Sequence, residues 1–103
     1  MSIINDILRT GISVKSSDIH LNVGLPPLFR VNTVIQKSDF PIMTQEGALR
    51  MLQEILPADR HADFEKHKDA DFSYEIPGLA RFRVNAHYQR GSIALAFRAI
   101  NDK

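Results

Sequence analysis

The sequence predicts an α+β domain in which an antiparallel sheet of about six strands carries its helices mainly on one face. Three stretches place apolar residues at helical spacing, and the others alternate apolar and polar residues as half-buried strands do. These elements follow in the order helix, three strands, two helices, three strands, which is typical of an antiparallel sheet with helices on one side. The chain of 103 residues is expected to form one domain over residues 1–103.

In the first half of the chain, isoleucines and a leucine at helical spacing predict a helix from residue 3 to about Gly11. Alternation over 18–23 then predicts a half-buried strand. The Gly-Leu-Pro-Pro segment at 24–27 ends this strand, because proline donates no backbone hydrogen bond and keeps its predecessor extended. Two short strands are expected next, over 28–31 and 34–36.

In the second half, Thr44 is a candidate N-cap for a helix over 45–56. A second helix over 58–68 follows a proline, which is common at the start of a helix. The alternating segment 71–76 predicts a strand, and Pro77-Gly78 predicts the turn that leads into the last hairpin.

This last hairpin contains the most informative residues of the chain. Alternation puts Arg81 and Arg83 on one face of its first strand, and Arg98 shares a face of the second strand with small alanines. A turn near residues 89–91 would therefore collect the three guanidinium groups on one surface, a good geometry for a phosphate or a carboxylate. The alternative is an ordinary solvated sheet face, with the arginines paired to acidic neighbours such as Asp71 or Glu75.

Composition excludes several classes of function. A formal net charge of +1 gives no global field for nucleic acid or an anionic membrane, so neither partner is expected. The absence of cysteine excludes a disulfide scaffold and thiol chemistry. No signal-peptide pattern and no apolar run of membrane-spanning length occurs, so we expect a cytoplasmic domain without direct membrane insertion.

Two pairs of polar residues suggest a metal or acid–base site less strongly than a structural role. Asp18 and His20 share a face of their strand, but two ligands without a third make a poor metal site, and a structural hydrogen-bonding role is favoured. His61 and Glu65 stand four residues apart on a helix and are expected to form a solvated, salt-bridging face. We therefore predict no metal site.

Four segments in a fixed order resemble one known family over essentially the whole chain. They are Ser17-Asp18-Ile19-His20-Leu21, Gly24-Leu25-Pro26-Pro27 with Arg30-Val31, Asp71-Phe72-Ser73-Tyr74 with Pro77-Gly78, and Arg81-Phe82-Arg83-Val84-Asn85 with Gln89-Arg90-Gly91 and Phe97-Arg98. Together they resemble the N-terminal, PAS-like domain of the type IV pilus retraction (twitching motility) ATPases of the secretion ATPase superfamily. The fold that this resemblance implies is a PAS-like antiparallel sheet.

The resemblance also implies a homohexameric motor that binds ATP and Mg²⁺ and works in the cytoplasm, at the inner face of the membrane, with a platform protein of the pilus machinery. In that family the N-terminal domain packs on the RecA-like ATPase domain of a neighbouring subunit, and its strand arginines approach the nucleotide phosphates. Arg83 and Arg98 match those arginines best, and Arg81 and Arg90 are weaker candidates. Asp18, His20, Pro26 and Pro27 are expected to be structural or interface residues.

This chain departs from the family pattern at three places. Asn32-Thr33 replaces a common Asp-Gly turn, and His87-Tyr88 stands where Phe-Asn is common. The five glycines form no Gly-x-x-x-x-Gly-Lys-Ser/Thr phosphate loop, so the chain alone is not expected to hydrolyse ATP or to bind a cofactor. We therefore expect an N-terminal domain of a larger motor, whose RecA-like ATPase domain this chain does not contain.

Two alternatives remain open from the sequence. The first is a free-standing PAS-like sensor that binds a small molecule between sheet and helices. The second is an interaction module in which the segment 24–29, with an exposed Pro26-Pro27, docks a partner protein.

Overall fold

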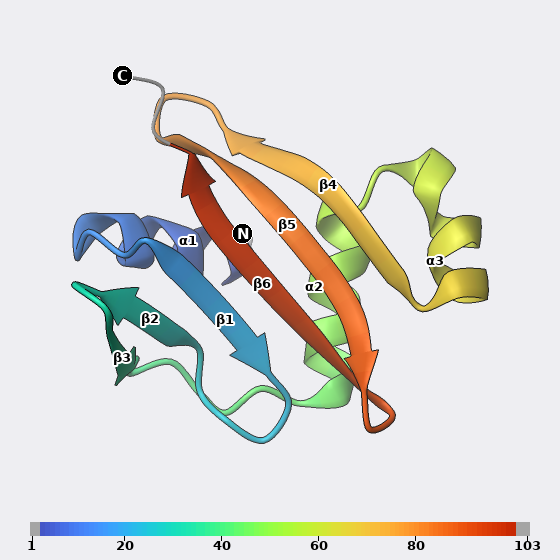
Figure 1. Ribbon diagram of the computed structural model, residues 1–103, viewed down its shortest axis with the longest axis horizontal. Coiled ribbons are helices and arrows are strands. Elements are labelled where there is room, and N and C mark those ends of the chain that lie inside the picture. The colour runs from blue at the N-terminus through green and yellow to red at the C-terminus, as the bar shows by residue number, and fades with distance from the viewer. Residues whose placement is uncertain (1–2, 101–103) are drawn as a thin grey trace.

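A single antiparallel sheet of six strands, in the order β3-β2-β1-β6-β5-β4, is the centre of the computed structural model, which describes residues 3–100 (Figure 1). The predicted α+β fold is confirmed. The elements are α1 (Ile3–Ser13), β1 (Asp18–Asn22), β2 (Leu28–Val31), β3 (Val34–Lys37), α2 (Gln45–Ile55), a 3₁₀ turn η1 (Ala58–Arg60), α3 (His61–His67), β4 (Asp69–Ile76), β5 (Ala80–Gln89) and β6 (Ser92–Ile100).

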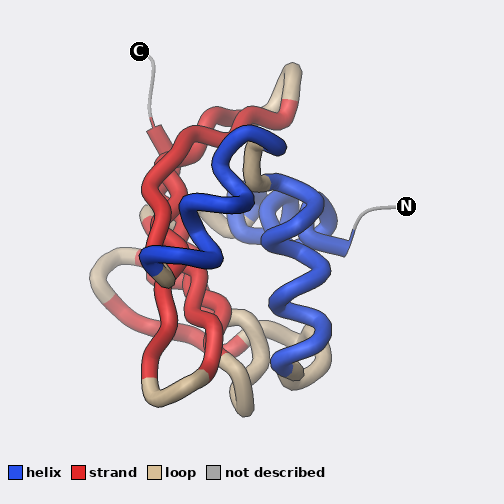
Figure 2. Tube along the Cα trace, turned by 90° about the vertical axis from the view of Figure 1, so that its right-hand side faces the viewer, coloured by secondary structure: helices blue, strands red, loops and turns tan. Residues whose placement is uncertain are grey.

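The helices α1 and α2 lie against one face of the sheet, while α3 lies beyond its β4 edge (Figures 1 and 2). Apolar side chains that alternate along the strands fill the space between the sheet and the two helices. At its centre, the rings of Phe82 and Phe97 meet edge to face with centroids 6.2 Å apart. Among residues 3–100 no helix covers the opposite face of the sheet (Figures 1 and 2), and most of the charged and polar side chains of β1 and β5 lie on this uncovered face.

The hairpin of β5 and β6 is the longest pairing in the sheet and fixes the register of the uncovered face. It closes through a two-residue loop at Arg90-Gly91, whose φ angles of 55° and 81° match the twist of the strands. The short β2–β3 turn has the same left-handed backbone, with φ angles of 52° at Asn32 and 69° at Thr33. A β-branched threonine is an unusual residue there, and its hydroxyl donates to the Asn32 carbonyl.

Three predicted elements have different ends. The helix expected over 58–68 is divided into the 3₁₀ turn η1 and the helix α3, which begins at His61. The helix α1 continues through Ser13, because Gly11 does not end it but packs its bare backbone against Ile19 of β1. The strand β4 begins at Asp69 rather than at residue 71. The predicted N-cap is confirmed, since the Thr44 hydroxyl accepts a hydrogen bond of 3.0 Å from the Gly47 amide.

Tyr74 connects the sheet to the first helix. Its hydroxyl donates a 2.7 Å hydrogen bond to Asn5 Oδ1 of α1. Burial raises the pKa of the Tyr74 hydroxyl above its usual value, and the negative charge of Glu54 raises it further, while the hydrogen bond with Asn5 opposes the rise.

The two edges of the sheet differ in chemistry. All four residues of β3 are exposed, with Val34 at 56% and Ile35 at 45%. Along β4 the exposed positions carry mostly carboxylates, at Asp69, Asp71 and Glu75. Arg60 also covers part of the β4 edge by donating a 3.0 Å hydrogen bond to the Asp71 carbonyl.

Candidate functional site

A row of charged residues crosses the uncovered face of the sheet. Asp18 of β1 lies directly opposite Arg30 of β2 on one side and opposite Arg98 of β6 on the other. Arg98 in turn lies opposite Arg83 of β5. The register therefore brings three arginines and one aspartate into a single line, although they come from distant parts of the sequence.

A shallow depression of about 470 Å³ lies beside this row. Its lining includes Ala96, with His20 and Asn85 opposite Ala96 on the two neighbouring strands. Because alanine has a short side chain, the surface sinks between these taller neighbours, and Arg83 and Arg98 stand at one end of the hollow. The arrangement suits a small anion that meets planar guanidinium groups from one side.

Arg83 and Arg98 face each other without a carboxylate between them. Like charges directly opposite on adjacent strands are unfavourable. Among residues 3–100 Arg83 forms no ion pair, so the alternative in which it is paired with Asp71 or Glu75 is not what the structure has. Asp71 instead accepts a 3.0 Å hydrogen bond from Asn85 Nδ2. An anion bound between the two arginines would relieve their repulsion.

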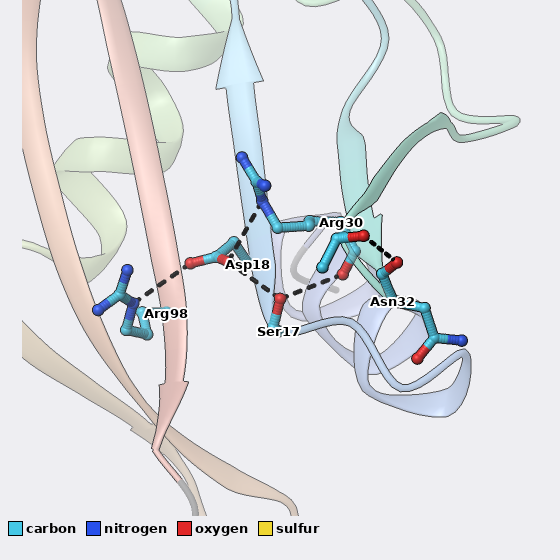
Figure 3. A network of polar contacts seen from close by, with 6 residues as sticks. Ser17, Asp18, Arg30, Asn32 and Arg98 are labelled. Atoms are coloured by element: carbon cyan, nitrogen blue, oxygen red, sulfur yellow. Dashed lines mark hydrogen bonds and ion pairs between the residues drawn. The ribbon is translucent and has the colours of Figure 1, made fainter.

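On the other side of Arg98, the negative charge of Asp18 offsets the positive charges of Arg98 and Arg30, as Figure 3 shows. Its Oδ1 accepts a hydrogen bond of 3.3 Å from Arg98 Nε, and its Oδ2 lies 3.6 Å from Arg30 Nε. The Ser17 hydroxyl donates to the same Oδ2 at 3.0 Å. Asp18 therefore lies in an ion-pair network with Arg30 and Arg98. Sequence analysis quoted Arg30 only as part of a family segment and did not name it as a site residue.

The two weaker arginine candidates occupy different places. Arg81 lies on the same face as Arg83, two residues along β5, opposite Ile100 and Glu75. Arg90 is in the hairpin loop, seven residues from Arg83, which corresponds to about 20 Å along a strand. Arg90 therefore does not belong to the same cluster.

Two of the four histidines form hydrogen-bond contacts with neighbouring residues. His61 Nε2 lies 2.9 Å from the Leu56 carbonyl rather than in a salt bridge with Glu65. His87 Nδ1 lies 2.8 Å from Asn85 Oδ1, which gives a His87–Asn85–Asp71 chain on the uncovered face. In the part of the chain that the structure describes, no three histidine, aspartate or glutamate side chains come together as a metal site would require.

One expectation about the proline segment was wrong. Pro27 is fully buried, with less than 2% of its surface exposed, and its carbonyl accepts a 3.0 Å hydrogen bond from the Ser38 amide. It lines an apolar hollow together with Ile7 and Phe40. Gly24 and Leu25 are exposed and Pro26 is half-buried, so a pair of exposed prolines is not available to a partner.

The hollow nearest to what a sensor would need lies outside the sheet–helix core. It is a groove of about 670 Å³ between α2 and α3, where Phe64 stacks on Tyr88 with centroids 5.7 Å apart. Its rim carries exposed, charged side chains such as Glu65 and Lys66.

No protein-family model matches the chain. The type IV pilus retraction ATPase PilT of Pseudomonas aeruginosa is 35% identical over 100 residues, which cover 97% of this chain. The crystal structure of the pilus retraction motor PilT with bound ADP superposes with a TM-score of 0.89, at 35% identity and again over 97% of this chain. The chain is homologous to the N-terminal region of the type IV pilus retraction ATPases.

A second relative supports this assignment in sequence, and a further solved structure shares the fold. A twitching motility protein of Neisseria gonorrhoeae is 31% identical over 94 residues, or 91% of this chain. The Legionella pneumophila ATPase DotB shares the fold, with a TM-score of 0.81 at 24% identity over 96% of this chain and 28% of its own. The chain spans only part of these relatives, namely 29% of PilT, in sequence and in the solved structure alike, and 25% of the Neisseria protein.

Proposed function

We propose that this chain is the N-terminal domain of a homohexameric ATPase that powers type IV pilus retraction. In this proposal the uncovered face packs on the RecA-like ATPase domain of a neighbouring subunit and presents Arg83 and Arg98 to the phosphates of ATP bound there. The observation that carries it is the direct opposition of Arg83 and Arg98 beside a hollow over Ala96. Homology to pilus ATPases supports a nucleotide phosphate as the anion, because the PilT structure contains ADP.

The chemistry assigned to the two arginines is electrostatic. Negative charge spreads over the phosphoryl oxygens during hydrolysis, and a guanidinium group supplied from another subunit stabilises that charge. Two arginines on adjacent strands of a rigid sheet hold their donors in place before the nucleotide arrives, so little reorganisation is needed. Binding also removes the repulsion between Arg83 and Arg98, which couples nucleotide occupancy to contact between subunits.

Mg²⁺ is assigned to the ATPase domain and not to this chain. Mg²⁺ in nucleotide sites is held by one or two carboxylates, waters and the phosphates themselves. Of the two carboxylates that line the hollow, Asp18 has both oxygens engaged by arginines and Ser17, and Asp71 accepts a hydrogen bond from Asn85. The donor set of this face therefore fits an anion and not a divalent cation.

The proposal includes a location for the motor. Homologues that drive twitching motility lead us to propose a cytoplasmic hexamer that contacts a platform protein of the pilus machinery at the inner face of the membrane. Over residues 3–100, no helix is long and apolar enough to cross a membrane.

Arginine variants in the complete motor test the proposal. Arg83→Ala and Arg98→Ala should each lower kcat for ATP hydrolysis, by up to about 10³-fold for an arginine that acts in trans, without changing the melting temperature of this domain. Arg50→Ala is the matched control, because Arg50 is an exposed arginine of α2 in an ion pair of 3.8 Å with Glu46. Near-normal turnover of both strand variants would refute the role of the arginines.

A further inference from the structure

We infer that Asp18 is a positioning residue for Arg98, holding its guanidinium group by Nε and leaving the two terminal nitrogens for a phosphate group. This role rests on the proposed function, in which Arg98 meets the phosphates of ATP. In this role the Asp18 carboxylate orients the Arg98 guanidinium group toward a nucleotide that another subunit binds.

The geometry of the ion-pair network supports this role. Asp18 is well enclosed, with 18% of its side chain exposed, whereas 77% of the Arg98 side chain is exposed. The contact joins Asp18 Oδ1 to Arg98 Nε at 3.3 Å. In Figure 3 one terminal nitrogen of Arg98 points away from Asp18 and the other lies beside the Nε contact, and within residues 3–100 neither forms a hydrogen bond or an ion pair.

The second oxygen of Asp18 explains why the contact is limited to Nε. An arginine usually meets a carboxylate through two parallel hydrogen bonds, which would occupy one of its terminal nitrogens. Here Oδ2 already accepts from Ser17 at 3.0 Å and lies 3.6 Å from Arg30. Asp18 therefore offers one oxygen to Arg98, and the donors that a phosphate needs stay available.

Asp18 also determines on which side of the row Arg98 is held. Arg98 lies between Arg83, which repels it, and Asp18, which attracts it, because the three residues are directly opposite one another on β5, β6 and β1. A long side chain that is already restrained loses less conformational entropy when a phosphate binds. Without the carboxylate, Arg98 would move freely over the surface.

The test is Asp18→Asn in the complete motor, compared with Glu46→Gln. Both changes replace a carboxylate that pairs with an exposed arginine, but Glu46 lies on α2, where its pair with Arg50 spans 3.8 Å. We expect Asp18→Asn to lower kcat for ATP hydrolysis by about tenfold, with a smaller change in KM, because the interaction acts mainly in the transition state. Glu46→Gln should leave both constants unchanged.

A double-mutant cycle separates positioning from a merely structural role. If Asp18 acts through Arg98, then Asp18→Asn should cause no further loss of kcat in an Arg98→Ala motor. An undiminished tenfold loss in that background would overturn the inference. Normal turnover of Asp18→Asn in a motor that Arg98→Ala impairs would overturn it while leaving the proposed function intact. Normal turnover of Arg98→Ala would overturn the inference together with the phosphate contact proposed for Arg98, and the proposed function would then depend on Arg83→Ala.

A measurement on the isolated chain avoids the motor altogether. The Arg98 Nε–H resonance in ¹⁵N NMR should be protected from solvent exchange in the unchanged chain and in Glu46→Gln, and exchange-broadened in Asp18→Asn. Equal protection in all three chains would mean that Asp18 does not hold Arg98 and would overturn the inference. The amide resonances of the core report in the same spectra whether each variant is folded.

Discussion

Adding one methyl group at Gly11 tests how closely α1 is packed on the sheet. In Gly11→Ala the new Cβ would overlap Ile19 Cδ1, lie 2.9 Å from Ile19 Cγ1 and lie 3.4 Å from a ring carbon of Phe29. Both neighbours are buried, at 1% and 5% exposure, so neither has free space to enter. Overpacking of this kind costs about 1–3 kcal/mol, whereas alanine gains up to about 1 kcal/mol over glycine inside a helix. We expect a net loss of about 1–2 kcal/mol.

Urea unfolding followed by circular dichroism measures this loss, and a thermal melt should show Tm lower by about 5–15 °C for a domain of this size. Gly47→Ala is the matched control, because a Cβ there meets only the Thr44 hydroxyl, at 3.1 Å, in the first turn of α2. That variant should be as stable as the unchanged chain or slightly more stable. A Gly11→Ala chain as stable as the unchanged one would show that α1 can move off the sheet, and would refute the close-packing argument.

Two further predictions concern residues on the helix-covered side of the sheet. Thr44→Ala removes the side chain that accepts the Gly47 amide at 3.0 Å, so it should lower the free energy of unfolding in urea by about 1 kcal/mol, whereas Thr44→Ser should restore most of it. The pKa of Tyr74 is raised by burial and by Glu54, so the folded chain keeps its phenolic proton at pH values where the unfolded chain releases it. This difference stabilises the folded chain below about pH 10, and the stabilisation should be lost as the pH rises through the pKa of Tyr74 in the folded chain. The urea midpoint of the unchanged chain should therefore fall more steeply with pH than the midpoint of Tyr74→Phe. Midpoints of the two chains that run parallel above about pH 10 would contradict this.

The parts of the fold that depend on periodicity along the chain were predictable from the sequence. Alternation in β5 and β6, with a short loop at Arg90-Gly91, was enough to place Arg83 and Arg98 on one face. A hairpin is a local structure, so its register follows from its loop. The Thr44 cap was predictable for the same reason, because its hydrogen bond spans only three residues.

Contacts between distant segments were not predictable in this way. The pairing of Asp18 with Arg30 and Arg98 requires β1 to lie between β2 and β6, and no pattern within a strand specifies its neighbours. Gly11 resembled a helix end because glycine disfavours helices, but its close approach to β1 depends on tertiary packing. The interaction-module alternative took Pro26-Pro27 as exposed, but the prolines in the sequence indicate only where the strand ends and not how deeply Pro27 is buried.

The unequal edges of the sheet determine where two copies of this domain can join through their backbones. A strand laid along β4 would meet the carboxylates of Asp69, Asp71 and Glu75, and Arg60 already occupies one of the carbonyls it would need. Charge on an edge strand is a common protection against such pairing. The β3 edge lacks such a row of charges: its four residues include the exposed Val34 and Ile35 and one charged residue, Lys37. Intermolecular strand addition, and aggregation of the concentrated domain, should therefore begin at β3.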